Sequence, residues 1–146
     1  MQTFLPYASF SESARVLDRQ RLGKQRVETL QIAKALVTGT GWVNHPATRM
    51  WAGNLGSLYQ YQAAICYEWT TVRGYRDTCL EKTAVLLDFI PDDPEQIVQC
   101  ECCNPRWLGD EELHRSHRSN LLRKAPEHYR MYWPDEPDDL PYVWPH

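Results

Sequence analysis

Hydrophobic residues recur at helical spacing along three stretches of the chain. The first stretch runs from about Ser11 or Ser13 to Val37; serine is a good N-cap, and Gly39 follows as a stop signal. Its apolar residues fall on one side of a helix with about 3.6 residues per turn. They are Leu22, Ile32, Ala33 and Leu36. The pattern predicts one long amphipathic helix.

Three polar residues, Asp18, Gln25 and Thr29, fall on the same side of this predicted helix. Polar groups inside an apolar stripe need hydrogen-bond partners or serve a site. A buried hydrogen-bond network is the commoner explanation, and a functional role is the alternative.

A second helix is expected from near Pro46 to a point before Gly74. Gly53 and Gly56 weaken its first turns, which leaves a later start open. Residues three and four positions apart form its core-facing stripe. They are Leu55, Leu58, Gln62, Ile65, Trp69 and Val72.

A third helix is expected from Asp110 to Lys124, with acidic residues at its start and basic residues at its end, as the helix dipole favours. Pro126 begins a further short helical turn, and residues 91–105 are expected to form a loop. No alternating strand pattern is found. At 146 residues the chain fits one domain. We therefore predict an all-α fold: a single compact domain of about three main helices over residues 1–133, with a loop-rich C-terminal part. Residues 134–146 would form a Pro-rich acidic tail, packed on this domain or trailing from it.

The net charge of −3 conceals two basic segments. The segment from Arg15 to Lys34 holds six Lys or Arg residues and two acidic ones, a local charge of +4. The segment from His114 to Lys124 holds four Lys or Arg residues and no acidic one, again +4. Such segments can bind phosphates whatever the total charge, although solvated helix faces explain them about as well.

Five cysteines are an odd number, and Cys100, Cys102 and Cys103 stand too close together for the usual spacing of zinc ligands. We expect free thiols, no metal and no cofactor, since nucleotide-binding glycine motifs are also missing. No apolar run approaches the roughly 18 residues that a membrane span needs, and the first residues do not form a secretory signal. A cytoplasmic monomer is expected.

The chain contains the run Leu17-Asp18-Arg19-Gln20-Arg21-Leu22, and Glu28 stands ten residues after Asp18. This pattern resembles the first-helix signature of the pyrimidine-dimer DNA glycosylase family. Two further segments are similar to it, in the family's order: Asn44-His45-Pro46 leading through Leu58 to Arg73–Thr78, and Asn120–Lys124 leading to Pro126–Tyr129. The loop from Leu80 to Trp107 has no obvious counterpart in the family's phage enzyme.

The resemblance implies removal of a damaged base from duplex DNA, followed by strand cleavage at the abasic site. An amine attacks the sugar C1′, the base departs, a Schiff base forms, and β-elimination breaks the strand. Glu28 matches the family's carboxylate, which stabilises the sugar cation and moves protons. The alternative for Glu28 is an exposed helix partner of Lys24 or Gln25.

The resemblance implies that the nucleophile is the α-amine at the start of the chain. Such an amine titrates near 7.7–8, so about a tenth or more is unprotonated at neutral pH. Gln2 follows Met1, and a large second residue normally prevents removal of the methionine, so we assign the amine to Met1. The family commonly has Arg immediately before the matched Glu, where this chain has Val27.

We therefore expect a DNA glycosylase, possessing or lacking the lyase step, whose partner is duplex DNA with a damaged or modified base. Its expected catalytic residues are Glu28 and the Met1 amine. The residues expected to contact DNA are Arg21, Lys24, Arg26, His45, Arg115, His117, Arg118, Asn120, Arg123 and Lys124. The alternative is a non-catalytic DNA-binding protein that retains the fold, and a protein-interaction module using the acidic tail has little support.

Overall fold

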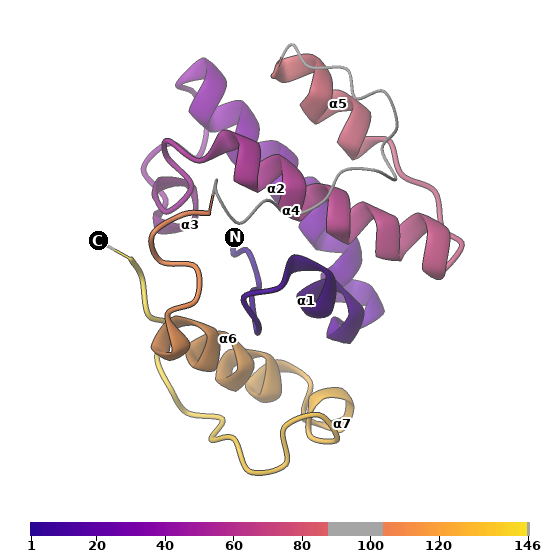
Figure 1. The fold of residues 1–146 in the computed structure, drawn as a ribbon, viewed down its shortest axis with the longest axis vertical. Helices are drawn as coiled ribbons and strands as arrows, with labels where there is room; N and C mark the ends of the chain where they lie inside the picture. The colour runs from indigo at the N-terminus through magenta and orange to yellow at the C-terminus, as the bar shows by residue number, and fades with distance from the viewer. Residues whose placement is uncertain (88–103, 146) are drawn as a thin grey trace.

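The computed structural model describes residues 1–87 and 104–145, and within these ranges it is helical and contains no strand (Figure 1). The all-α prediction is confirmed. The elements are α1 (Phe10–Val16), α2 (Arg19–Thr38), α3 (Pro46–Arg49), α4 (Leu55–Tyr67), a π-helical turn η1 (Glu68–Val72), α5 (Cys79–Leu86), α6 (Glu111–Lys124) and α7 (Pro126–Tyr129).

The first predicted helix is two helices, so the prediction of one continuous helix is wrong. The chain is extended at Leu17 and Asp18, between α1 and α2. The hydroxyl of Tyr129, on α7, accepts a hydrogen bond from the Asp18 backbone N–H at 3.0 Å and donates one to the Asp18 carboxylate. This contact comes from a residue 111 positions away, and it satisfies the N–H that a continuous helix would have bonded internally.

The second predicted helix starts late. Pro46 begins the one-turn helix α3, Gly53 takes a positive φ of 77° in the following turn, and α4 begins at Leu55. Beyond α4 the chain widens into η1, and a π-turn adds a residue and shifts every later side chain around the axis. Val72 is consequently 58% exposed, so its assignment to the core stripe is wrong.

Helix α5 was not predicted. The residues that it buries are Cys79, Thr83 and Ala84, and these small or polar side chains give no strong apolar stripe. Helix α6 matches the third prediction: it begins after Asp110, whose carboxylate accepts a hydrogen bond from the Glu112 N–H at 3.1 Å. The cysteine cluster and most of the predicted loop lie outside the described residues.

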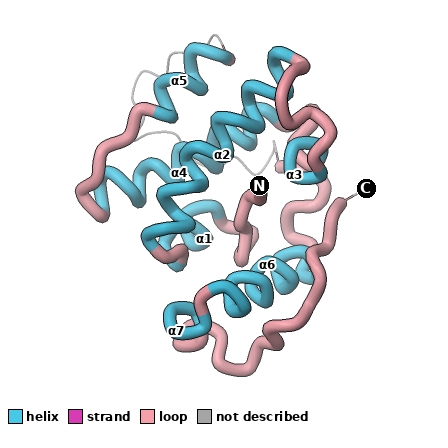
Figure 2. Tube along the Cα trace, turned by 180° about the vertical axis from the view of Figure 1, so that it is seen from behind, coloured by secondary structure: helices cyan, strands magenta, loops and turns pink. Residues whose placement is uncertain are grey.

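The first six residues pass between the α2–α4 pair and α6, and Figure 2 shows the N-terminus in that position. Thr3 and Leu5 are fully buried. The Thr3 hydroxyl accepts a hydrogen bond from the Trp51 indole at 3.0 Å, and the Phe4 carbonyl accepts one from the Tyr61 hydroxyl at 2.7 Å. The extended backbone of this segment is thus satisfied by side chains, because no strand lies beside it among the described residues.

From α6, His117 holds the same segment: its Nδ1 accepts the Leu5 N–H at 2.9 Å. Burial lowers the pKa of His117 to about 3, with the nearby His114 acting in the same direction. The imidazole is therefore neutral in the folded protein, and because Nδ1 accepts a hydrogen bond, its single N–H proton lies on Nε2.

We expect the pH dependence of the free energy of unfolding to reflect the titration of His117. Below about pH 6.5 the unfolded chain binds a proton at His117, whereas the folded chain does not until about pH 3. Stability should therefore fall as the pH drops through this window, by up to about 1.4 kcal/mol per pH unit from this group. Urea unfolding at pH 7.0, 5.5 and 4.5 measures it. His117→Asn keeps an acceptor near Nδ1 and should show a shallower fall; an equally steep fall would contradict the assignment.

Candidate active site at the N-terminal segment

Glu28 and Gln25 of α2 hold the start of the chain. Gln25 is fully buried; its Nε2 donates to the Gln2 carbonyl at 2.7 Å and to Glu28 Oε2 at 2.9 Å. Its Oε1 accepts a hydrogen bond from the Phe4 N–H at 3.0 Å and lies 2.8 Å from the Tyr61 hydroxyl, whose one proton is shared between this oxygen and the Phe4 carbonyl. The Gln2 N–H points at Glu28 Oε2 over 3.4 Å. The polar stripe of the sequence is thus a buried network, and that network places the first residues against a carboxylate.

Burial raises the pKa of Glu28 above its ordinary value. The Gln2 backbone N–H, the terminal ammonium, Lys24 and Gln25 favour the ionised form and reduce the shift without cancelling it. A half-buried carboxyl with a raised pKa and a cation beside it is the kind of group that can take up and return a proton.

His45 lies near the same ammonium. Burial and then the charge of the terminal ammonium lower the pKa of His45. Its Nδ1 accepts the Ala47 N–H at 3.0 Å and caps α3, so the proton of the neutral ring lies on Nε2. The structure therefore brings His45 to the side of the site where the chain begins.

An open groove with a volume of about 780 Å³ runs along α2 and includes Glu28. We call it the α2 groove. One residue from η1, Trp69, forms its wall, and the remaining lining comes from α2. The lining residues are Arg19, Gln20, Gly23, Lys24, Val27, Glu28, Gln31 and Trp69.

The basic residues of α2 divide into exposed and paired ones. Lys24 is exposed and lines the groove, as does Arg19, which sequence reasoning placed in the basic run without naming it as a contact. Arg21 is paired with Asp18 at 3.1 Å, and Arg26 with Asp77 at 2.7 Å. An arginine already paired with a carboxylate is less available to a phosphate, so Lys24 and Arg19 are the better candidates.

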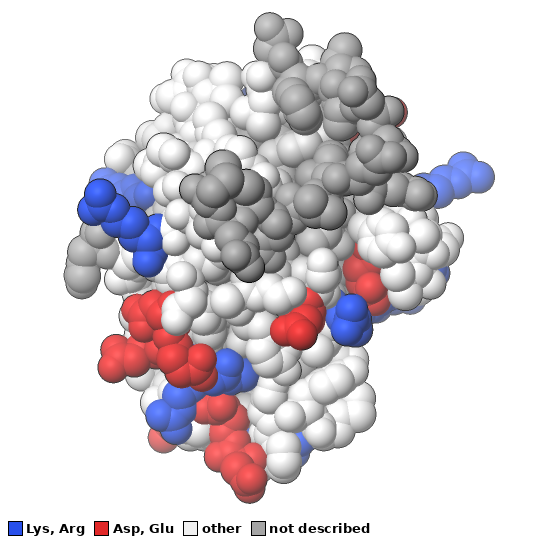
Figure 3. All heavy atoms as spheres, viewed as in Figure 1, with Lys and Arg blue, Asp and Glu red and all other residues white. Residues whose placement is uncertain are grey.

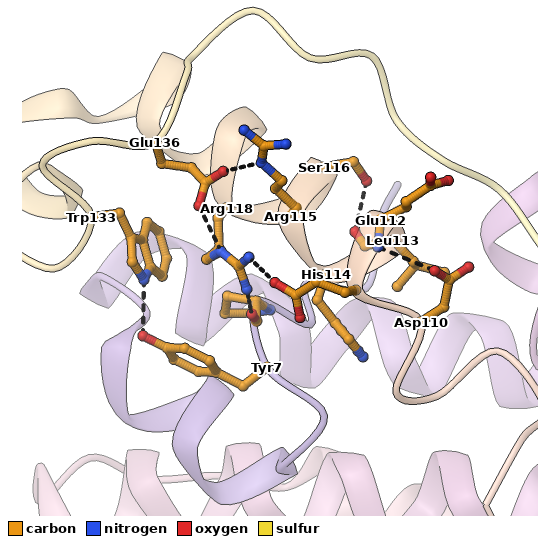
Figure 4. A network of polar contacts seen from close by, with 12 residues as sticks. Tyr7, Asp110, Glu112, Leu113, His114, Arg115, Ser116, Arg118, Trp133 and Glu136 are labelled. Carbon is orange, nitrogen blue, oxygen red and sulfur yellow. Dashed lines mark hydrogen bonds and ion pairs between the residues drawn. The ribbon is translucent and has the colours of Figure 1, made fainter.

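The basic residues of α6 hold the C-terminal segment instead. Arg115 and Arg118 both contact the carboxylate of Glu136, and Figure 4 shows them converging on it. Arg118 also bonds Glu111 and the Pro6 carbonyl. In the lower part of Figure 3, where α6 and residues 134–145 lie, acidic side chains surround the basic ones. Two of the four Lys and Arg residues of α6 are therefore paired with carboxylates of the chain.

Three of the other α6 residues expected to contact DNA, His117, Asn120 and Arg123, have internal partners too. His117 has no exposed surface, and the buried Asn120 side chain donates to the carbonyls of Ser116 and Leu140. Arg123 donates to the carbonyls of Asp138 and Leu140, whereas Lys124 is exposed. The structure thus divides the expected site residues into two sets. Glu28, Lys24 and His45 lie around the start of the chain, whereas the residues of α6 contact the C-terminal segment.

The tail brings two aromatic residues toward the site. The Tyr142 ring lies 5.9 Å from His117 and the Trp144 ring 6.3 Å from His45, measured between centroids. Burial raises the pKa of Tyr142; the charge of Glu28 adds to this effect, while Arg123 and Arg21 oppose it. From the sequence, this segment could be recognised only as acidic and proline-rich, and that composition does not indicate where the segment packs.

Within residues 1–87 and 104–145, no group of three or more His, Cys, Asp or Glu side chains is arranged to hold a metal ion. In the same ranges, no helix is long and apolar enough to cross a membrane.

Comparison with known proteins assigns the family. Residues 1–83 match the family model described as pyrimidine dimer DNA glycosylase. No curated protein and no solved structure matches the chain. The matched residues contain the buried network, Glu28, His45 and the whole α2 groove, and they make up more than half of the sequence. The chain therefore belongs to the pyrimidine dimer DNA glycosylase family.

Proposed function

We propose that this chain removes a damaged base from duplex DNA by amine catalysis, with the Met1 α-amine as nucleophile and Glu28 as the carboxylate that moves protons. The observation that supports this most is the half-buried Glu28, whose Oε2 faces the Gln2 N–H at 3.4 Å. The amine of Met1 is one residue away from that N–H. Its positive charge acts to lower the pKa of both Glu28 and His45.

In the proposed first step the lone pair of the amine forms a bond to the sugar C1′, and the bond between C1′ and the base breaks. The bonding electron pair leaves with the base, which takes up a proton from solvent. Positive charge develops on the sugar, and the ionised form of Glu28 stabilises it. As the sugar ring opens, the ring oxygen takes a proton and C1′ becomes a Schiff base with the amine. In this proposal Glu28 accepts the proton that the attacking amine must lose.

The strand-cleaving step would follow from the same intermediate. Loss of a proton from C2′ expels the 3′ phosphate and breaks the C3′–O bond by β-elimination. A carboxylate with a raised pKa can both accept such a proton and return it. The lyase step is thus proposed for the same two groups, without a metal.

A non-catalytic DNA-binding protein is the second candidate. The observation that favours it is Val27, an exposed apolar residue beside Glu28, where the family commonly carries a cation. The trapping experiment separates the two candidates.

Borohydride trapping tests the proposed chemistry directly. With a duplex that carries an abasic site or a pyrimidine dimer, reduction should yield a covalent protein–DNA adduct, because borohydride reduces the Schiff base. Mass spectrometry should place the sugar on the first peptide, and acetylating the α-amine should abolish the adduct while binding persists. Binding without any adduct would favour the second candidate, and an adduct on Lys24 would move the nucleophile to α2.

Replacing Glu28 by Gln should separate catalysis from binding. The shape and the acceptor for the Gln2 N–H are retained, while the negative charge and the proton acceptor are lost. We expect excision to slow by roughly 10²–10⁴-fold, with equal or slightly tighter DNA binding. Glu81→Gln, at an exposed position on α5, is the matched control and should keep the wild-type rate. Equal rates for the two variants would remove Glu28 from the mechanism.

The salt dependence of DNA binding should identify the docking face. Lys24→Gln should reduce the slope of log K against log salt by about 0.9, the value for one phosphate contact. Arg115→Gln, also at an exposed position, should leave the slope unchanged, since Arg115 is paired with Glu136 at 2.6 Å. Equal losses of slope for the two variants would show that α6 also contacts the phosphates.

A further inference from the structure

The start of the chain is held from two sides. On the side of α2, Gln25 bonds the Gln2 carbonyl and the Phe4 N–H. On the side of α6, hydrogen bonds reach the backbone of Leu5 and Pro6. Figure 2 shows the N-terminus between these helices. An extended segment that is held at only one point can turn about that point, so both sets of contacts affect where the first residue lies.

Both backbone groups of Leu5 are bonded by histidines of α6. His117 Nδ1 accepts the Leu5 N–H at 2.9 Å, and His114 Nδ1 lies 2.8 Å from the Leu5 carbonyl oxygen. Burial lowers the pKa of His114, so its ring is neutral. Because His114 Nε2 accepts the Gly109 N–H at 2.9 Å, the proton of that ring lies on Nδ1 and is donated to Leu5.

The next residue, Pro6, is held by a guanidinium. Its carbonyl accepts a hydrogen bond from Arg118 at 2.8 Å. A proline has no N–H, so this carbonyl is the one backbone group through which hydrogen bonding can hold Pro6. The Arg118 side chain is only 11% exposed, and its remaining nitrogens bond the carboxylates of Glu111 and Glu136. Figure 4 shows the guanidinium of Arg118 beside the carboxylate of Glu136.

Glu136 links Arg118 to the C-terminal segment. Its carboxylate is 15% exposed, lies 3.1 Å from Arg118 Nε and also pairs with Arg115 at 2.6 Å. The segment that carries it is fixed on α6 a few residues later, where the Leu140 N–H donates to the Ser119 hydroxyl at 3.0 Å. The two ends of the chain therefore meet at one guanidinium.

The geometry of a guanidinium makes this junction possible. Its N–H groups form a rigid planar fork, so Arg118 can bond a carbonyl and two carboxylates at once, whereas the ammonium of a lysine is a single point charge. The two carboxylates also compensate its charge, which leaves Arg118 less available to a phosphate. Without Glu136 the fork loses the contact at its Nε, and the direction of the N–H that bonds Pro6 is no longer fixed from that side.

We propose that Arg118 is a positioning residue for the Met1 amine. Together with Glu136 it fixes Pro6, and it thereby helps to keep the first residue at the carboxylate of Glu28. The inference rests on the proposed function, since it takes that amine as the nucleophile. It gives a role to the acidic C-terminal segment, which lies outside the residues that match the family model. A displacement of about 1 Å caused far from the chemistry can cost about a hundredfold in rate, so a distant contact can control the amine.

Trapping kinetics test the position of the amine. Arg118→Lys keeps the charge but loses the fork. With a saturating duplex that carries an abasic site, we expect borohydride trapping to proceed about tenfold more slowly, because one of the two holds on the segment is weakened. The affinity for the duplex and the fraction of protein finally trapped should not change, whereas partial unfolding would lower that fraction. An unchanged trapping rate would overturn the proposal.

A double-mutant cycle tests whether the C-terminal segment acts through Arg118. Glu136→Gln should slow trapping as well, and the double variant should be no slower than the slower single variant, because both changes break one contact. Asp139→Asn removes the same charge at an exposed position of the same segment and should trap at the wild-type rate. Losses that multiply in the double variant, or an equal loss in Asp139→Asn, would contradict the proposed coupling.

Hydrogen exchange tests the same contact without any activity. In Arg118→Lys and Glu136→Gln the amides of residues 2–5 should exchange severalfold faster than in the wild type, while those of α4 keep their rate as the internal control. Unchanged exchange in residues 2–5 would overturn the proposal even if trapping slows. A wild type that forms no adduct would remove the catalytic proposal, and faster exchange in the variants would still identify Arg118 and Glu136 as the residues that hold the start of the chain.

Discussion

The arrangement of this molecule depends on the buried amide of Gln25. An uncompensated buried amide costs several kcal/mol on transfer from water to an apolar medium, so a glutamine with no exposed surface is tolerated only where its hydrogen bonds are made. Gln25 makes its bonds to the backbone at Gln2 and Phe4 and to Tyr61 and Glu28. One side chain thus ties the start of the chain, α2 and α4 together. The requirement that fixes the fold here also fixes the distance between the chain's first residues and a carboxylate.

The tertiary structure decides which basic residues of this protein have carboxylate partners and which do not. The two basic segments carry the same local charge in the sequence, yet Arg118 is engaged by Glu111, Glu136 and a carbonyl, whereas Arg19 and Lys24 face an open groove. A count of charges along α6 cannot distinguish these cases, because one of the two carboxylates that pair with Arg118, that of Glu136, comes from a segment 18 residues later. The electrostatic character of each face becomes visible only when the tail is in place.

Local signals in the sequence were enough for α6: a capping aspartate, acidic residues at the start and basic ones at the end are all short-range features. They were not enough for the break before α2, which a hydroxyl from α7 stabilises, or for α5, whose buried side chains are small or polar. Glu28 and Met1 could be named because a family signature marks the carboxylate. The position of Trp69 beside the groove could not be predicted, because Trp69 has the spacing of a core residue in the sequence. The residues that contact its ring, Arg26 and Tyr75, come from different parts of the chain.

The position of the groove's wall depends on the number of residues in the π-helical turn η1. A π-turn differs from an α-helical one by a single extra residue, and each residue rotates later side chains by about 100° around the axis. Shortening the chain by one residue just before Trp69 would let α4 continue as a regular helix and would turn the indole away from Gly23. The packing of α4 against α2 would be little affected. Single-residue insertions and deletions at this point are thus a route by which relatives of this chain can alter the wall of the groove while keeping the same core.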